Sequence, residues 1–127
     1  MMNLIAIRGA TTVVANEYAE MLQNTKRLLQ EMMQKNCIDD HHIISIFFTC
    51  TKDLNAGYPA KAARELISAN VALFCCQEMD VPDSLPKCIR ILMHTLSTYD
   101  QNNVKHVYLN NATKLRPDLI IKQEDIK

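Results

Sequence analysis

The chain has 127 residues, a length that fits one domain and leaves no room for a second of ordinary size. Apolar residues make up 48% and charged residues 22%, as in soluble globular proteins, which excludes a disordered or membrane-spanning chain. Fourteen Lys and Arg residues balance fourteen Asp and Glu residues, which disfavours nucleic acid and membrane surfaces as partners. We predict a single domain over residues 1–127, in which a local cluster of cations would bind any anion.

The five cysteines are odd in number and lack the spacing of a disulfide framework or a zinc site. Free thiols fit a reducing compartment. The apolar run at residues 4–7 is too short for a signal peptide and ends at Arg8 and Gly9. We therefore expect a cytoplasmic protein.

The first predicted elements are a strand and a long helix. Residues 4–7 predict a short buried strand that ends at a turn formed by Arg8 and Gly9, followed by a β-branched run at 11–14. Asn16 is a good N-cap for the helix that follows. The helix should cover a sheet, because its apolar residues form one stripe: Tyr18, Met21, Leu22, Thr25, Leu28, Leu29, Met32 and Met33.

The rest of the chain predicts four more strands and one short helix. We expect strands at residues 43–50, 71–76, 87–96 and 105–109, and a short helix that begins at Pro59 and ends at Leu66. This order has too few crossover helices for a doubly wound fold, so it predicts an α+β protein with a mixed sheet covered by one long and one short helix. The other face of the sheet would stay exposed, which favours oligomerisation.

Four cations are candidates for binding an anion. Arg90 interrupts an apolar strand and Arg8 follows another, so each needs an anion, a wet cleft or a solvent-facing position. Together, two fixed arginines could bind a ligand that carries two carboxylates. Lys61 and Arg64 lie three residues apart, on one face of the short helix, where they are either solvated surface charges or an anion site near the helix N-terminus.

The sequence signals for a functional carboxylate, a nucleophilic thiol or a metal site are weaker than the signals for an anion site. Glu78 follows an apolar strand, so it is either an ordinary loop carboxylate or a partly buried hydrogen-bond acceptor. No histidine pattern supplies a base for a cysteine nucleophile. His41 and His42 are read as loop histidines because no ligand spacing repeats, and two glycines cannot form a phosphate loop. We therefore predict no metal and no cofactor.

Segments along nearly the whole chain carry a resemblance to a known family. They read IRGATTV (7–13), YPAKAAREL (58–66), CCQEMDV (75–81), KCIR (87–90), HVYL (106–109) and LRPDL (115–119). In this order they resemble the monofunctional chorismate mutases of the small trimeric type, which are unlike the all-helical chorismate mutases. The resemblance implies a homotrimer that forms a pseudo-α/β barrel with active sites between subunits. It also implies the reaction, in which chorismate rearranges to prephenate by a Claisen-type pericyclic shift without covalent intermediate, cofactor or metal.

The same resemblance implies roles for individual residues. Arg90 would hold a substrate carboxylate and the ether oxygen on which negative charge grows, Arg8 would hold the other carboxylate side, and Glu78 would accept a hydrogen bond from the substrate hydroxyl with help from Cys75. The remaining implied pocket residues are Tyr58, Ala60, Lys61 and Arg64 from a neighbouring subunit, together with Leu73, Phe74, Tyr108, Leu115 and Arg116.

Two features depart from the expected pattern. Phe74 stands where the resemblance leads us to expect a small hydroxyl residue. Strand alternation also puts Cys75 and Glu78 on opposite faces, unless the strand ends or bulges at Cys76 or Gln77. Phe74 keeps open an alternative, a catalytically silent trimeric module that binds a small dicarboxylate. A small trimeric hydrolase acting on imines is a further alternative, although no positioned water and base can be identified for it.

Overall fold

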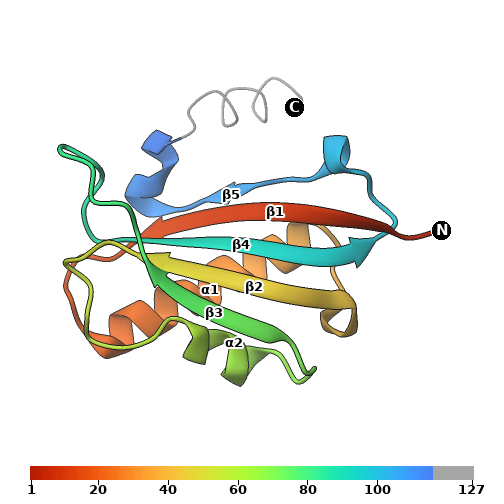
Figure 1. Ribbon diagram of the computed structural model, residues 1–127, viewed down its shortest axis with the longest axis horizontal. Coiled ribbons are helices and arrows are strands. Elements are labelled where there is room, and N and C mark those ends of the chain that lie inside the picture. Colours follow the sequence, from red (N-terminus) through yellow and green to blue (C-terminus); the bar gives the residue numbers. More distant parts are fainter. Residues whose placement is uncertain (116–127) are drawn as a thin grey trace.

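The computed structural model describes residues 1–115, which form a five-stranded mixed sheet with helices on one face (Figure 1). The strands are β1 (Asn3–Thr12), β2 (Ile43–Cys50), β3 (Ala72–Gln77), β4 (Cys88–Ser97) and β5 (Val107–Tyr108), and the helices are α1 (Tyr18–Lys35) and α2 (Ala60–Leu66). Three 3₁₀ segments, η1 (Asp40–His42), η2 (Gln101–Asn103) and η3 (Asn110–Leu115), complete the described chain. The predicted α+β class and the predicted pair of helices are confirmed.

The strand order is β3-β2-β4-β1-β5. The central strand β4 is antiparallel to both β1 and β2, whereas β3 runs parallel to β2 and β5 runs parallel to β1. The helix α2 supplies the crossover between the parallel strands β2 and β3, as such a connection requires. The sheet thus places β1, β4 and β2 side by side at its centre.

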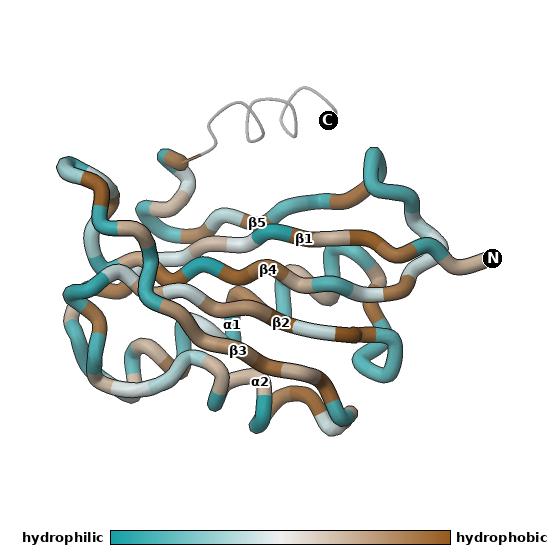
Figure 2. Tube along the Cα trace, in the orientation of Figure 1, coloured by the Kyte–Doolittle hydropathy of each residue, from teal (hydrophilic) through white to brown (hydrophobic). Residues whose placement is uncertain are grey.

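The core lies between the sheet and its helices. Alternate residues of the strands, among them Ile7, Phe48 and Met93, are fully buried against Leu28 and Met32 of α1. This pattern follows from the period of two along each strand, which sends successive side chains to opposite faces. Figure 2 shows hydrophobic stretches along the central strands and hydrophilic ones in the loops that join them.

Gly9 lies inside β1, so the expected turn at Arg8 and Gly9 is wrong. The strand continues to Thr12, with Gly9 opposite Ile91 of β4. A Cβ at Gly9 would lie 2.4 Å from the Met32 sulfur and 3.1 Å from Leu28 Cδ1. The glycine therefore serves the close approach of α1 to the sheet, and not a turn.

Smaller differences concern the ends of elements. Glu17 occupies the N-cap of α1, because Asn16 uses its side-chain oxygen to accept hydrogen bonds from the backbone N–H groups of Asn55 and Ala56. Pro59 is the cap residue of α2, one position before the helix begins. The strand β5 is shorter than predicted, since the side chain of His106 takes the place of a backbone partner for Arg8.

The sheet face opposite α1 carries large exposed apolar side chains. Leu4 is 61% exposed, Phe47 43% and Phe74 58%. The predicted uncovered face is therefore present in the described part of the chain. Within residues 1–115, no helix is both long enough and apolar enough to cross a membrane.

Candidate active site

Two cross-strand rows on the open face bring distant segments together. In the first row, β-sheet pairing places Cys76 beside Thr49, Thr49 beside Arg90, Arg90 beside Ala10, and Ala10 beside Tyr108. Because paired residues point to the same face, the register alone puts Arg90 between the hydroxyl of β2 and the phenol of β5.

The second row carries the other arginine. It runs from Phe74 through Phe47 and Leu92 to Arg8. A cavity of about 350 Å³ opens over the two rows, and we call it the central hollow. It brings together five of the predicted site residues, and it adds Phe47 and Thr49, which were not predicted. The five are Arg8, Glu78, Arg90, Tyr108 and Leu115.

Glu78 directly follows β3 and lines the central hollow, on the face that alternation gives to Phe74 and Cys76. The last residue of the strand is Gln77, and the Glu78 backbone N–H donates to the Cys50 carbonyl at 2.8 Å. Strand alternation keeps Cys75 on the helix-covered face, where it packs against the main core. The strand does end at Gln77, which was the condition for both side chains to reach one site, but Cys75 stays on the face opposite the central hollow.

A compact polar cluster forms one wall of the hollow. Glu78 Oε2 lies 3.2 Å from Arg90 Nε and accepts a hydrogen bond from Thr49 Oγ1 at 2.5 Å. The Glu78 side chain is 22% exposed and that of Arg90 is 45% exposed. Arg8 lines the same hollow, so two arginines and one glutamate share this cavity. The hollow therefore carries net positive charge, which suits a ligand with more than one negative charge.

Two thiols near the hollow are poor nucleophiles. Burial raises the pKa of the Cys50 thiol to about 12. Burial also raises the pKa of the Cys88 thiol, and the neighbouring Arg90 guanidinium only partly offsets it. Both groups are therefore protonated at neutral pH, whereas a nucleophilic cysteine acts as the thiolate.

Six of the predicted residues lie outside the central hollow, toward the β3 and α2 edge of the sheet; we call them the edge group. Tyr58 and Cys75 line one surface depression, and Arg64 and Leu73 line another. The edge group consists of Tyr58, Ala60, Lys61, Arg64, Leu73 and Cys75. Within it, Lys61 is exposed and Ala60 is only 2% exposed.

The two remaining predicted residues belong to neither set. Phe74 is exposed on the open face and packs edge-on against Phe47, with ring centroids 6.0 Å apart. Arg116 lies outside the described residues. Phe74 therefore meets the central hollow through Phe47, since Phe47 is a lining residue and Phe74 is not.

Thr49 and Phe47 are two of the lining residues that the sequence prediction missed, and Thr49 is the one that contacts a predicted site residue through its side-chain hydroxyl. Both lie in the strand predicted at residues 43–50, which was correctly placed. Their role depends on the pairing of β2 with β3 and β4, which join segments far apart in the chain. The alternation of Phe47 and Thr49 with buried Ile46 and Phe48 was a signal that both face away from the helices.

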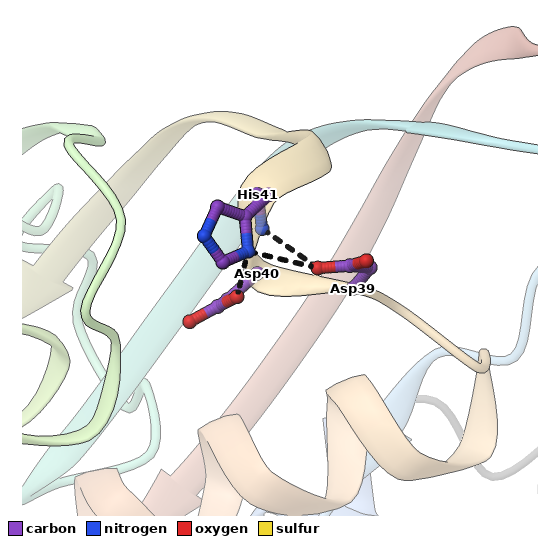
Figure 3. A group of neighbouring side chains, drawn as sticks. All are labelled: Asp39, Asp40 and His41. Carbon is purple, nitrogen blue, oxygen red and sulfur yellow. Dashed lines mark hydrogen bonds and ion pairs between the residues drawn. The ribbon is translucent and has the colours of Figure 1, made fainter.

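A second group of polar side chains lies at the start of β2 (Figure 3). His41 Nδ1 is 2.9 Å from an oxygen of Asp40 and 3.3 Å from an oxygen of Asp39. The carboxylates already serve the local structure, because Asp39 accepts the His41 backbone N–H and Asp40 accepts hydrogen bonds from Ser68. We therefore interpret this exposed group as the hydrogen-bonded turn that leads into the strand.

The fold and the central hollow define a small α+β domain whose uncovered sheet face holds a cleft lined by two arginines and a glutamate. The chain belongs to the type I chorismate mutase family, whose family model matches residues 4–119. The family confirms both the resemblance found in the sequence and the predicted enzyme class, an isomerase of aromatic amino acid biosynthesis.

Similar proteins agree with the family assignment. The chain is 42% identical to chorismate mutase AroH of Bacillus subtilis (strain 168) over 93% of this chain and 94% of that protein. It is 40% identical to chorismate mutase AroH of Thermus thermophilus over 89% of this chain and 93% of that protein. Among solved structures, a chorismate mutase from Clostridium thermocellum matches with a TM-score of 0.84 at 51% identity, covering 86% of this chain and 97% of that one.

Proposed function

We propose that the chain converts chorismate to prephenate in the central hollow, and that Arg90 stabilises the negative charge that develops on the ether oxygen. The observation that carries this proposal is the placement of Arg90 between Glu78 and Arg8 in a single cavity. It is supported by membership of the type I chorismate mutase family.

The chemistry of the substrate matches the groups in the hollow. Chorismate carries two carboxylates, a hydroxyl and an enol ether, and its rearrangement breaks the C–O bond while a C–C bond forms. Arg8 and Arg90 each bind a carboxylate, and Glu78 accepts the hydrogen bond of the hydroxyl. A guanidinium suits this site because it stays charged in a partly desolvated cavity.

Electrostatic stabilisation and substrate orientation together can account for a large rate gain over the uncatalysed rearrangement. A gain on the order of 10⁶ requires about 8 kcal/mol of stabilisation that favours the transition state over the ground state. One preorganised donor aimed at developing charge contributes roughly 3–4 kcal/mol. Holding the flexible substrate in its compact reactive conformer supplies much of the rest. Arg90 supplies the donor, and the paired charges of the hollow supply the orientation.

We also propose a homotrimer in the form of a pseudo-α/β barrel, in which each site lies between two subunits. Two observations support it. Phe47, Phe74 and Leu4 leave apolar surface on the open face, and the edge group lies outside the central hollow of its own chain. In the trimer, Tyr58, Ala60, Lys61 and Arg64 of one subunit complete the hollow of its neighbour. Light scattering tests the assembly, and a monomer at micromolar concentration would contradict it.

The localisation that we propose is the cytoplasm. All five cysteines are free thiols, and Cys37 and Cys76 are exposed. Exposed free thiols suit a reducing compartment, because an oxidising one promotes their conversion to disulfides.

The decisive experiment mixes the purified protein with chorismate and follows the loss of chorismate absorbance. Prephenate is confirmed by its conversion in acid to phenylpyruvate. We expect turnover far above the uncatalysed rate. Chorismate that binds without turnover, in a protein shown to be folded, would contradict the proposal. That result would favour the silent dicarboxylate-binding module, for which the aromatic contact between Phe74 and Phe47 is the specific observation.

A further inference from the structure

We propose that Thr49 is a positioning residue for Glu78, and that its hydroxyl fixes the orientation in which the carboxylate is presented to the substrate. The proposal rests on the function proposed above. It concerns a residue that acts through Glu78, and it assigns Thr49 no contact with the reacting atoms.

The two oxygens of Glu78 are in different situations. Oε2 accepts the Thr49 hydroxyl at 2.5 Å and lies 3.2 Å from Arg90 Nε. Within residues 1–115, no hydrogen bond reaches the other oxygen, Oε1. Two donors therefore hold one oxygen, and the other remains available as the acceptor for a ligand hydroxyl in the central hollow.

The strand register makes this arrangement rigid on the donor side. Thr49 lies on β2 directly beside Arg90 of β4, so the two donors approach Oε2 from neighbouring strands. A β-branched side chain in a strand has few χ1 rotamers, which keeps the Thr49 hydroxyl in place. Glu78, in contrast, follows the end of β3, and its backbone N–H bond to Cys50 fixes the main chain but not the carboxylate.

Because of the Thr49 hydroxyl, Arg90 is not the sole group that holds the Glu78 carboxylate in place. Without this hydroxyl, the ion pair with Arg90 would be the only polar contact of the carboxylate within residues 1–115, and the carboxylate could turn about the last side-chain bond. Such rotation would compete with the contacts that Arg90 makes to the substrate. A hydrogen bond between a hydroxyl and a carboxylate is short and strong. Thr49 therefore keeps the orientation of Glu78 while leaving Arg90 for charge stabilisation.

The test compares Thr49→Val, which keeps the shape without the hydroxyl, with Thr49→Ser, which keeps the hydroxyl. Both substitutions are made in the wild-type chain and together with Glu78→Ala. We expect Thr49→Val to lower kcat/KM about tenfold or more, as for loss of a hydrogen bond to a charged group. We expect Thr49→Ser to stay within about threefold of the wild type, and Thr49→Val to have no further effect once Glu78 is alanine.

The matched control is Thr95→Val. Thr95 is fully buried in β4, and its hydroxyl bonds to the Leu96 carbonyl at 3.1 Å, away from the hollow. We expect its kcat/KM to be unchanged. An equal loss of kcat/KM from Thr49→Val with and without Glu78, or no loss in either background, would overturn the proposal.

Thermal unfolding provides a measurement that does not depend on turnover. At one protein concentration, Thr49→Val should lower the melting temperature in the wild-type background and leave it unchanged in Glu78→Ala. If the wild-type chain shows no turnover of chorismate, the proposed function fails and this comparison alone decides the role of Thr49. Equal melting shifts in both backgrounds would then overturn the positioning role.

Discussion

The central hollow and the edge group differ in how the chain builds them. In the hollow, residues from β1, β2, β4, β5 and the end of β3 converge because the strands pair in a fixed register. At the edge, Tyr58, Lys61 and Arg64 belong to a single crossover through α2, and they line other depressions or project from the surface. One chain therefore brings the two arginines and the glutamate of the predicted site into one cavity and leaves the edge group outside it.

The difference suggests that the hollow and the edge group contribute to catalysis in different ways. The hollow holds two arginines and a carboxylate, and because the proposed function gives them the charged groups of the substrate, changes there should reduce catalysis most. The edge group adds cations from a helix that packs its alanines into the core and exposes Lys61 and Arg64. We expect changes at the edge to have smaller effects, and to act on the site of a neighbouring subunit.

The largest effect is expected at the centre, for Arg90→Ala. We predict a loss of kcat/KM of roughly a thousandfold, because a preorganised donor to the developing charge is removed. Assembly should persist in light scattering, since Arg90 is 45% exposed in the described chain. The control is Arg27→Ala, a surface arginine of α1 paired with Glu31. Near-normal kcat/KM in Arg90→Ala would remove this residue from its proposed role.

Glu78 should give the next largest effect, and two substitutions separate its functions. We predict that Glu78→Ala lowers kcat/KM by about a hundredfold, because both the acceptor and the partner of Arg90 are lost. Glu78→Gln should be milder, since an amide oxygen still accepts a hydrogen bond from the substrate hydroxyl. Steady-state kinetics on the two variants decide between these functions. Equal losses would show that the charge of Glu78 matters and its acceptor oxygen does not.

Complementation tests whether the edge acts across subunits. Arg64→Ala alone should lower kcat/KM about tenfold or more, as for loss of one cation contact to a substrate carboxylate. Trimers that combine Arg64→Ala chains with Arg90→Ala chains should regain activity, because about a third of the shared sites in each mixed trimer would contain both intact residues. The two chains are co-expressed with different tags and the mixed assemblies purified. Activity no higher than the average of the two variants would contradict a shared site.

The sequence predicted features that depend on one segment better than features that depend on contacts between distant segments. Local periodicity placed α1 and β2 well, because a helical stripe and a β-branched run are signals within one segment. The continuation of β1 through Gly9 was missed, since the reason for that glycine is the Met32 side chain of a different element. Thr49 was missed for the same kind of reason. Its importance comes from pairing with Arg90, which is not visible in the order of residues along the chain.

The family resemblance supplied roles that local patterns could not, and the structure separates those roles in space. Arg8, Glu78 and Arg90 are brought into one hollow, as their implied roles require. Cys75 packs toward the core, so a contribution from its side chain to the same hollow of its own chain is not favoured by this geometry. In the proposed trimer, Cys75 remains with the edge group.

The smallest effect is expected for Phe74→Thr, which lies between the two regions. Phe74 does not line the hollow but contacts its lining residue Phe47, with the rings at 61° and their centroids 6.0 Å apart. Removing the ring should widen the binding site beside Phe47. We expect KM to change by about threefold or less and kcat to stay unchanged, because binding of the ground state and of the transition state is altered equally. Phe74→Leu is the matched control, since it keeps apolar volume without the ring contact. A tenfold loss of kcat in Phe74→Thr, but not in Phe74→Leu, would instead mean that the apolar contact with Phe47 holds the rows of the central hollow in register.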